Sequence, residues 1–271
     1  MSGLGAIEAL RGGLHWTAPI LMPSAAAFGA RLEARPLADL AEPQALAGAA
    51  VAAARFLGAD AVWVSAAPAA GLTLSAAAHR DAVTRAAAAA GRLKLAVLAE
   101  IPGPIARARA LGGDLDAALR EIKPGLIEEF EALSRLRPDI IVLREPAASG
   151  EEAANRSLPR LYGALKRLAE HFDILKGMWP ALPEMTGPAR PDLSFAPAPD
   201  APEAGPVTGE RALAIAPDWS DAPGFGAALQ RGRGAAAAAG LPLIVSGCAG
   251  LAHDTEPQLA RAAIATITER A

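Results

Sequence analysis

The chain has 271 residues, of which 52% are hydrophobic and 20% are charged, and its 26 basic and 29 acidic side chains give a formal net charge of -3. The apolar fraction excludes a disordered chain, and the lack of a basic excess argues against a protein that coats nucleic acid. The single cysteine, Cys248, cannot form an intramolecular disulfide, and no apolar run of about 18 residues resembles a membrane span. We therefore expect a soluble, cytoplasmic protein with neither a membrane nor a nucleic acid as partner.

Short apolar runs rich in Val, Ile and Leu recur along the chain, bounded by Gly or Pro, and predict strands that are buried on both faces. In chain order the runs occupy 18–22, 59–65, 94–101, 139–143, 172–178, 193–196, 211–216 and 241–246. Longer stretches with helical spacing lie between most of them, at 43–57, 75–90, 115–136, 151–171, 225–239 and 256–269.

Repeated alternation of strand and helix is typical of either a doubly wound sheet or a (β/α)8 TIM barrel. Eight strands favour the barrel. We therefore predict an α/β protein in which residues 1–271 form a single barrel domain.

The segment 179–206 holds eight prolines and cannot form an ordinary long helix. It is expected to be a surface excursion from the barrel. The alternative is an active-site lid over the barrel mouth.

In a barrel, the site is built at the carboxyl ends of the strands and from the loops that follow them. Polar or reactive side chains at these positions are Ser65, Glu100, Arg144, Glu145, Lys176, Asp218, Trp219 and Cys248, and His253 follows in the last loop. We predict catalytic roles for Glu145, Glu100 and Cys248. Substrate binding is predicted for Arg144, Lys176, Asp218, Trp219 and His253.

Arg144 and Glu145 follow four apolar residues, so both emerge where a buried strand ends. The pair could bind an anion and accept a proton, with Lys176 compensating Glu145, or it could close the rim as an ion pair. Glu100 precedes a rigid Pro-Gly-Pro turn, and it could act in the site or pair inside the barrel with a Lys or Arg of a neighbouring strand.

The histidines and the cysteine do not have metal-ligand spacing, because the four histidines form no His-x-x-His and the chain has no Cys-x-x-Cys. His79 and His171 are expected to face solvent from helices. The glycine-rich stretch 224–234 lacks a phosphate-binding fingerprint. We therefore expect no bound metal.

The last part of the chain carries a family resemblance. Residues 241–250 read LPLIVSGCAG, and Asp254-Thr255-Glu256-Pro257 and an Ala-rich helix follow. This end resembles the uroporphyrinogen decarboxylase and cobalamin-dependent methyltransferase superfamily, in which the final strand ends in a glycine-rich turn. Weaker matches at 103–106, 126–146 and 158–161 follow in the family's order. The resemblance implies a divergent, short member with a (β/α)8 barrel.

Decarboxylases of this family hold substrate carboxylates with arginines after the first strand and use an aspartate after the second. The matching positions here, 22–28 and Ala66, contain no arginine and no carboxylate. A porphyrinogen with many carboxylates needs such cations. Uroporphyrinogen decarboxylase activity is therefore not expected.

Methyltransferases of this family activate a thiol with zinc, held by a His-x-Cys after the fifth strand and a Cys in the final turn. Cys248 matches the last position, but Lys176-Gly177-Met178 stands at the others and cannot bind zinc. The chain also lacks the Asp-x-His-x-x-Gly motif that binds cobalamin. A corrinoid would therefore have to be carried by a partner protein, and the chain alone is expected to bind no cofactor.

These observations favour a methyltransferase-like barrel enzyme in one-carbon metabolism, acting with a corrinoid partner or a small-molecule methyl donor or acceptor. One alternative is a non-catalytic member that binds a ligand or partner. The other is a divergent decarboxylase or lyase that acts on a small acid with Glu100, Arg144 and Glu145.

Overall fold

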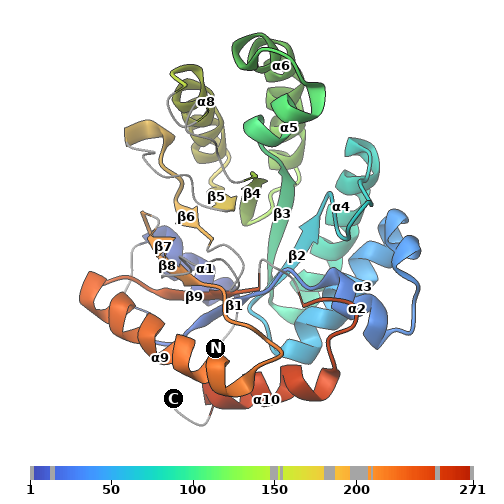
Figure 1. The fold of residues 1–271 in the computed structure, drawn as a ribbon, viewed down its shortest axis with the longest axis vertical. Helices are drawn as coiled ribbons and strands as arrows, with labels where there is room; N and C mark the ends of the chain where they lie inside the picture. The colour runs from blue at the N-terminus through green and yellow to red at the C-terminus, as the bar shows by residue number, and fades with distance from the viewer. Residues whose placement is uncertain are drawn as a thin grey trace.

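Strands and helices alternate along the chain (Figure 1). The structure is a computed structural model and describes residues 3–12, 16–146, 152, 155–179, 187–195, 207–208, 210–247 and 251–268. The strands are β1 (Ile20–Met22), β2 (Ala61–Ser65), β3 (Ala96–Pro102), β4 (Ile140–Arg144), β5 (Leu175–Trp179), β6 (Leu193–Ser194), β7 (Val207–Thr208), β8 (Leu213–Ile215) and β9 (Leu243–Ser246).

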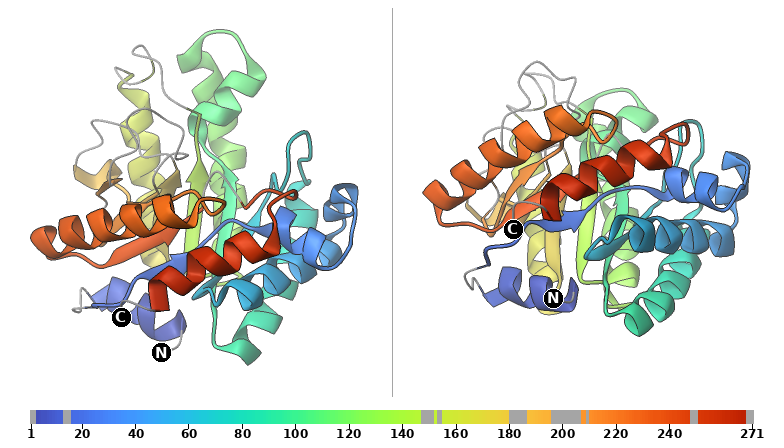
Figure 2. Two further views of the ribbon diagram at one scale, coloured as in Figure 1. Left: turned by 60° about the horizontal axis from the view of Figure 1, so that its bottom comes forward. Right: turned by 90° about the horizontal axis from the view of Figure 1, so that it is seen from below.

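The helices cover the strands from outside (Figure 2). They are α1 (Gly3–Gly12), α2 (Ala26–Leu32), α3 (Pro43–Leu57), α4 (Ala76–Leu93), α5 (Pro104–Leu111), α6 (Leu115–Ser134), α8 (Ser157–His171), α9 (Ala222–Ala239) and α10 (Pro257–Thr268), with short 3-10 helices η1 (Leu37–Ala41) and η2 (Gly187–Ala189). Within the described ranges, no helix is both long and apolar enough to cross a membrane.

The strands form two sheets, in the orders β2-β3-β4-β5-β6 and β1-β9-β8-β7. Every pairing is parallel except that of β7 with β8. The sheets meet at both edges: Asp60 N donates to Leu21 O at 2.9 Å beside β1 and β2, and Arg211 N donates to Asp192 O at 2.9 Å beside β6 and β8. The structure thus confirms an α/β protein built on parallel sheets, with strands in all eight predicted places. The short antiparallel β7 was not predicted.

Both faces of the strands are buried, which explains the continuous apolar runs. One cluster joins inner side chains of both sheets: Ile20, Met22, Ala61, Trp63, Ala96, Leu98, Ile140, Val142, Leu175, Leu193, Phe195, Ala212, Ala214 and Ile244. Ile7 and Leu10 of α1 belong to the same cluster. Arg11 of this helix lies 3.4 Å from Asp139, directly before β4, so α1 covers the amino ends of the strands. The carboxyl ends are therefore the end where loops can build a site.

An aspartate stands directly before each of β2, β4 and β6. The carboxylates of Asp60, Asp139 and Asp192 accept hydrogen bonds, each at 2.9 Å, from backbone N–H groups of β1, β3 and β5. Burial raises the pKa values of Asp60 and Asp139 while these hydrogen bonds oppose the shift. The same polar contact thus fixes the register of three strand pairs, β1 with β2, β3 with β4 and β5 with β6.

Of the two histidines that were expected to face solvent, one does and one does not. His171 is exposed as expected, but His79 is fully buried, which corrects the prediction that it faces solvent. The apolar face of α4 carries it, and its Nε2 lies 3.1 Å from Val64 O at the end of β2. Within the Pro-rich segment 179–206, the structure describes the last residue of β5, then 187–195 with η2 and β6. The rest of that segment lies outside the described residues.

We predict that Asp139→Ala lowers the free energy of unfolding by about 1 to 3 kcal/mol, because it leaves the Val97 N–H without its acceptor. Asp81→Ala is the matched control, since Asp81 forms only an exposed ion pair with Arg85 on α4, and we expect it to cost less than about 0.5 kcal/mol. Urea unfolding measures both. Equal effects of the two substitutions would contradict the role of the buried aspartates.

Candidate functional site

The carboxyl ends of β3, β4 and β5 bring large side chains to one place. Glu100 is paired in register with Ser65 of β2, and Arg144 is paired with Trp179 of β5. Residues paired in register point to the same face of a sheet. Because Val142 and Trp63 belong to the inner cluster, residues two positions further along these strands also face inward.

Glu100 is a buried carboxylate, with 1% of its surface exposed. Trp63 Nε1 donates to its Oε2 at 2.8 Å, and Ser65 Oγ donates to its Oε1 at 2.6 Å. Arg144 Nη1 lies 3.4 Å from Oε1. Burial raises the pKa of Glu100, while the charge of Arg144 and the two donors oppose this shift. The expected pairing of Glu100 with a basic residue of a neighbouring strand is therefore present.

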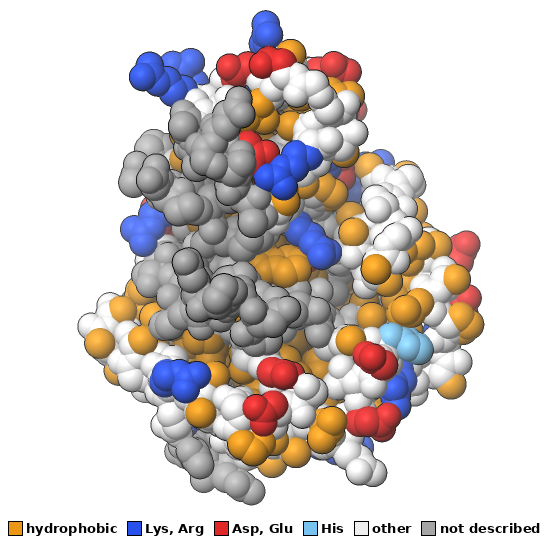
Figure 3. Space-filling model, in the orientation of Figure 1, with side chains coloured by type: hydrophobic (Ala, Val, Ile, Leu, Met, Phe, Trp, Pro, Cys, Tyr) orange, Lys and Arg blue, Asp and Glu red, His pale blue; other side chains and the backbone are white. Residues whose placement is uncertain are grey.

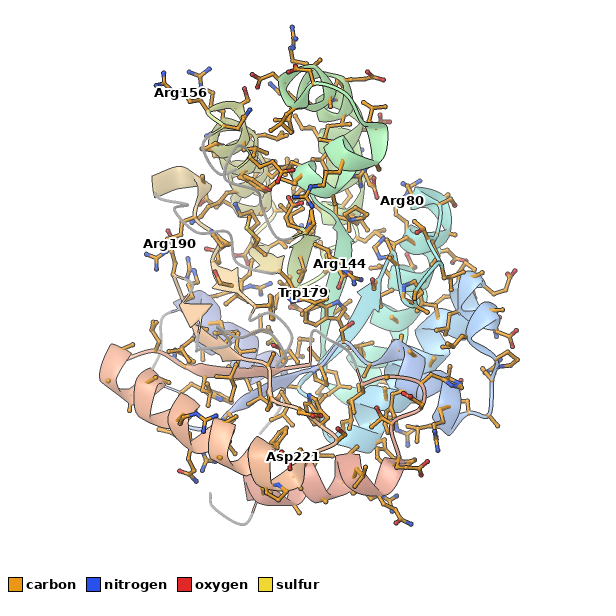
Figure 4. All side chains as sticks on the ribbon, in the orientation of Figure 1. Arg80, Arg144, Arg156, Trp179, Arg190 and Asp221 are labelled. Carbon is orange, nitrogen blue, oxygen red and sulfur yellow. The ribbon has the colours of Figure 1, made fainter. Side chains whose placement is uncertain are left out.

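Arg144 spans from this buried carboxylate to solvent, with 43% of its side chain exposed. Its Nη1 also donates to Ala67 O at 3.3 Å. The guanidinium carbon lies 4.6 Å from the centre of the Trp179 ring, a cation–π contact that Figure 4 shows near the middle of the molecule. Three contacts thus hold a cation that remains accessible.

Two cavities meet at Arg144, and both are lined by Ala67, Arg144 and Trp179. One, of about 550 Å³, is further lined by residues that include Ser24, Leu37, Leu72 and His253. The other, of about 530 Å³, is further lined by Glu100, Pro102, Ala106, Arg109, Glu145 and Pro146. Figure 3 shows Lys or Arg side chains exposed beside apolar ones near the middle of this face.

Glu145 lies on the other side of the strand from Arg144, between β4 and the helices. It accepts hydrogen bonds from the backbone N–H groups of Ile105, at 3.3 Å, and Ala106, at 3.0 Å, in the first turn of α5. The Tyr162 hydroxyl of α8 donates to Glu145 Oε1. Glu145 is 4% exposed, and burial raises its pKa from 4.5 to about 7 although the three donors oppose the shift. It therefore changes its charge near neutral pH.

Gly103 allows this contact. A Cβ at this position would overlap the carboxylate of Glu145, so only glycine lets that side chain reach the start of α5. Gly103 therefore leaves the space in which the carboxylate of Glu145, at the end of the next strand, can accept hydrogen bonds from α5.

Lys176 does not lie where the sequence analysis placed it, in the mouth beside Glu145. It lies between Leu175, which belongs to the inner cluster, and Gly177, where a Cβ would meet Phe195 of that cluster, so it points outward. It is fully buried, and its Nζ donates to Tyr162 O at 3.2 Å and Ala189 O at 2.8 Å. Burial lowers the pKa of Lys176 from 10.5 to about 7. The inward residues near the end of β5 are Gly177 and Trp179.

The remaining predicted residues lie in different places. His253 lines the 550 Å³ cavity, as expected for a residue near the mouth. Asp218 is exposed and accepts hydrogen bonds from Ser220, whereas Trp219 is buried against Phe225. Neither of these two lines the two cavities described above. Cys248 lies outside the described residues.

The described residues contain no group of three or more His, Cys, Asp or Glu side chains that could hold a metal ion. The structure adds three residues that the sequence analysis missed at this site: Arg109, Tyr162 and Trp179. Trp179 could have been found from the sequence, because side chains alternate along a strand and residues 177 and 179 therefore face the same side. Arg109 and Tyr162 come from helices, and their spacing carries no such signal.

No family model and no curated protein matches this sequence. Among solved structures, a methyltransferase from Methanosarcina mazei is similar, with 13% identity, a TM-score of 0.65 and coverage of 98% of this chain and 97% of that one. An alpha-L-fucosidase from Lactobacillus casei has 12% identity, a TM-score of 0.48 and coverage of 97% and 98%. A putative phosphonomutase from Burkholderia cenocepacia has 13% identity, a TM-score of 0.42 and coverage of 100% and 77%. The chain therefore shares a fold with the methyltransferase.

Titration of Glu145 is predicted to make stability depend on pH. Its pKa is about 7 in the folded chain and 4.5 in its ordinary environment, so the folded state binds more protons between these values. The stabilisation is present below about pH 4.5 and is lost as the pH rises through about 7, by on the order of 3 kcal/mol.

Urea unfolding at several pH values between about 4.5 and 8 checks this prediction against Glu145→Gln, which cannot titrate. We expect the free energy of unfolding to fall more steeply with pH in the wild type than in the variant. Identical slopes would show that Glu145 keeps an ordinary pKa.

Proposed function

We propose that this chain is a (β/α)8 barrel enzyme of methyltransferase type, which moves a one-carbon unit between a small anionic substrate and either a corrinoid carried by a partner protein or a small-molecule methyl donor or acceptor. The observation that carries the proposal is Arg144, a cation held by Glu100 and Trp179 at the carboxyl ends of the strands. Barrel enzymes bind their substrates at this end.

The barrel itself is supported by the edges of the two sheets. β1 lies beside β2, and β6 lies beside β8, which is the arrangement of edges that a closed ring of strands requires. The inner cluster draws residues from both sheets, as the core of a closed barrel does. The fold shared with the methyltransferase and the glycine-containing sequence at 247–250 support the one-carbon reaction.

Zinc does not fit the described site. The inward side chains near the end of β5 are Gly177 and Trp179, and neither offers a metal-ligating atom. A nucleophilic acceptor must therefore lose its proton to another group. Glu145 lines the cavity and has a pKa of about 7, so it is the described carboxylate best suited to accept that proton.

The residues of this chain divide the remaining tasks. Arg144 holds the anionic group of the substrate by charge-assisted hydrogen bonds, and the Trp179 ring packs against the apolar part of the substrate. Glu100 positions Arg144. A corrinoid, when its carrier protein presents it, supplies or accepts the methyl group.

The charged residues of the 530 Å³ cavity also favour a second candidate function, a decarboxylase or lyase. Two arginines and a carboxyl group with a pKa of about 7 line the 530 Å³ cavity, and a decarboxylase or lyase for a small acid needs such groups. A barrel that binds a ligand without turnover would use the same cations. These alternatives predict binding without methyl transfer.

Methylcobalamin is the probe for the proposed reaction, together with a panel of small thiols that carry a carboxylate or sulfonate. We expect loss of the methylcobalamin absorption spectrum at a rate proportional to the protein concentration. Arg144→Met should lower this rate at least about tenfold, because it removes a charge-assisted hydrogen bond to the substrate.

Arg107→Lys is the matched control. Arg107 contacts Pro102 O and Glu129, lies outside the lining of the cavity, and should leave the rate unchanged. A wild-type rate equal to the uncatalysed one with every acceptor would contradict the proposal, and so would an unchanged rate in Arg144→Met.

A further inference from the structure

The 530 Å³ cavity is lined by two arginines from different parts of the fold. Arg144 comes from the end of β4, and Arg109 comes from α5, the helix whose first turn binds Glu145. Their side chains are 43% and 44% exposed, so both reach solvent as well as the cavity.

Each arginine is positioned by a carboxylate. Glu152 accepts from Arg109 through both of its oxygens, at 2.7 and 2.6 Å, and only 10% of its side chain is exposed. Glu100 contacts Arg144 through one oxygen only, Oε1, which lies 3.4 Å from Arg144 Nη1, and it does so from a more deeply buried position. A bidentate pair fixes the plane of a guanidinium, so the direction in which Arg109 can bind an anion is fixed as well.

The cavity also has apolar lining beside the two arginines and the carboxylates of Glu100 and Glu145. Pro102, Ala106, Pro146 and Trp179 line the same cavity. Cations from two different elements, in a cavity that is also lined by apolar side chains, suit a molecule that has an anionic group at each end and a short hydrocarbon chain in the middle.

We propose that this cavity binds a small dicarboxylate, with one carboxylate on Arg144, the other on Arg109 and the methylene chain against Trp179 and the prolines. The inference rests on the proposed function, since it names the substrate class of the same site. A single inorganic anion would leave one guanidinium unused, and a cavity of about 530 Å³ is too small to enclose a porphyrin-sized molecule.

Glu145 gives the binding a measurable consequence. Glu145 faces Arg109, Tyr162 and the start of α5, and Glu152 lies nearby. Hydrogen bonds with Glu152 raise the pKa of Arg109, and the negative charges of Glu152 and Glu145 raise it further. A dicarboxylate places negative charge beside Glu145 and raises its pKa above about 7. Because the pKa of Glu145 is about 7, part of the population is ionised at pH 7, and binding there takes up a fraction of a proton.

Isothermal titration calorimetry tests the proposal with malonate, succinate and glutarate, and with propionate and butyrate as matched monocarboxylates. At least one diacid should bind at least about tenfold more tightly than the monoacids. Arg109→Lys should remove most of that advantage while leaving the weak binding of the monoacids unchanged, because Lys lacks the planar fork that Glu152 positions.

Arg107→Lys is again the control, on the same helix and also paired with a glutamate. Titrations at pH 7 in buffers of different ionisation enthalpy should show proton uptake in the wild type and none in Glu145→Gln. A diacid that binds no better than a monoacid, or whose affinity is unchanged in Arg109→Lys, would overturn the proposal.

Calorimetry measures binding without turnover. Diacid binding without methyl transfer would therefore remove the proposed reaction and leave this inference standing. Methyl transfer to acceptors with a single anionic group, without any preference for diacids in binding, would support the proposed reaction and overturn the diacid inference.

Discussion

The proposed site depends on the buried carboxylate of Glu100. Its charge lies inside the sheet, where an unpaired carboxylate would be costly, and it is matched by two neutral donors and one cation, Arg144. The same contact therefore stabilises the charge of Glu100 and directs the guanidinium toward the cavities. The alternation of side chains along β4 then sends Glu145 to the other side, where the start of α5 binds it. Helix α5 in turn carries Arg109 to the same cavity.

The strands could be predicted because both of their faces are buried. Inner side chains contact the other sheet and outer side chains contact the helices, so each strand appears in the sequence as a continuous apolar run. Even the weak run near residue 193 is a strand, β6. The two-residue β7 carries no comparable signal, because it pairs at one edge only and is too short to show a pattern. The burial of His79 was missed because its polar ring is accommodated by one carbonyl of β2, a contact between segments.

The sequence located the strand ends of the site, but not the direction of every side chain there. Glu100 and Arg144 emerge where buried strands end, and both lie in the site. Lys176 was placed on the wrong face, because a shift of one residue along a strand reverses the side to which a side chain points. Arg109 and Tyr162 reach the site only through the packing of α5 and α8 on the sheet, which no local pattern encodes.

A double-mutant cycle on the unfolding free energy tests the central claim, that Glu100 and Arg144 act as a pair, without needing any ligand. Urea unfolding at pH 7 would compare the wild type with Glu100→Gln, Arg144→Met and the double variant. Arg144→Met should cost at least about 1 kcal/mol more in the wild type than in the Glu100→Gln background, because only the wild type is left with an uncompensated buried charge. Additive effects, within about 0.3 kcal/mol, would contradict the pairing on which the proposed site is built.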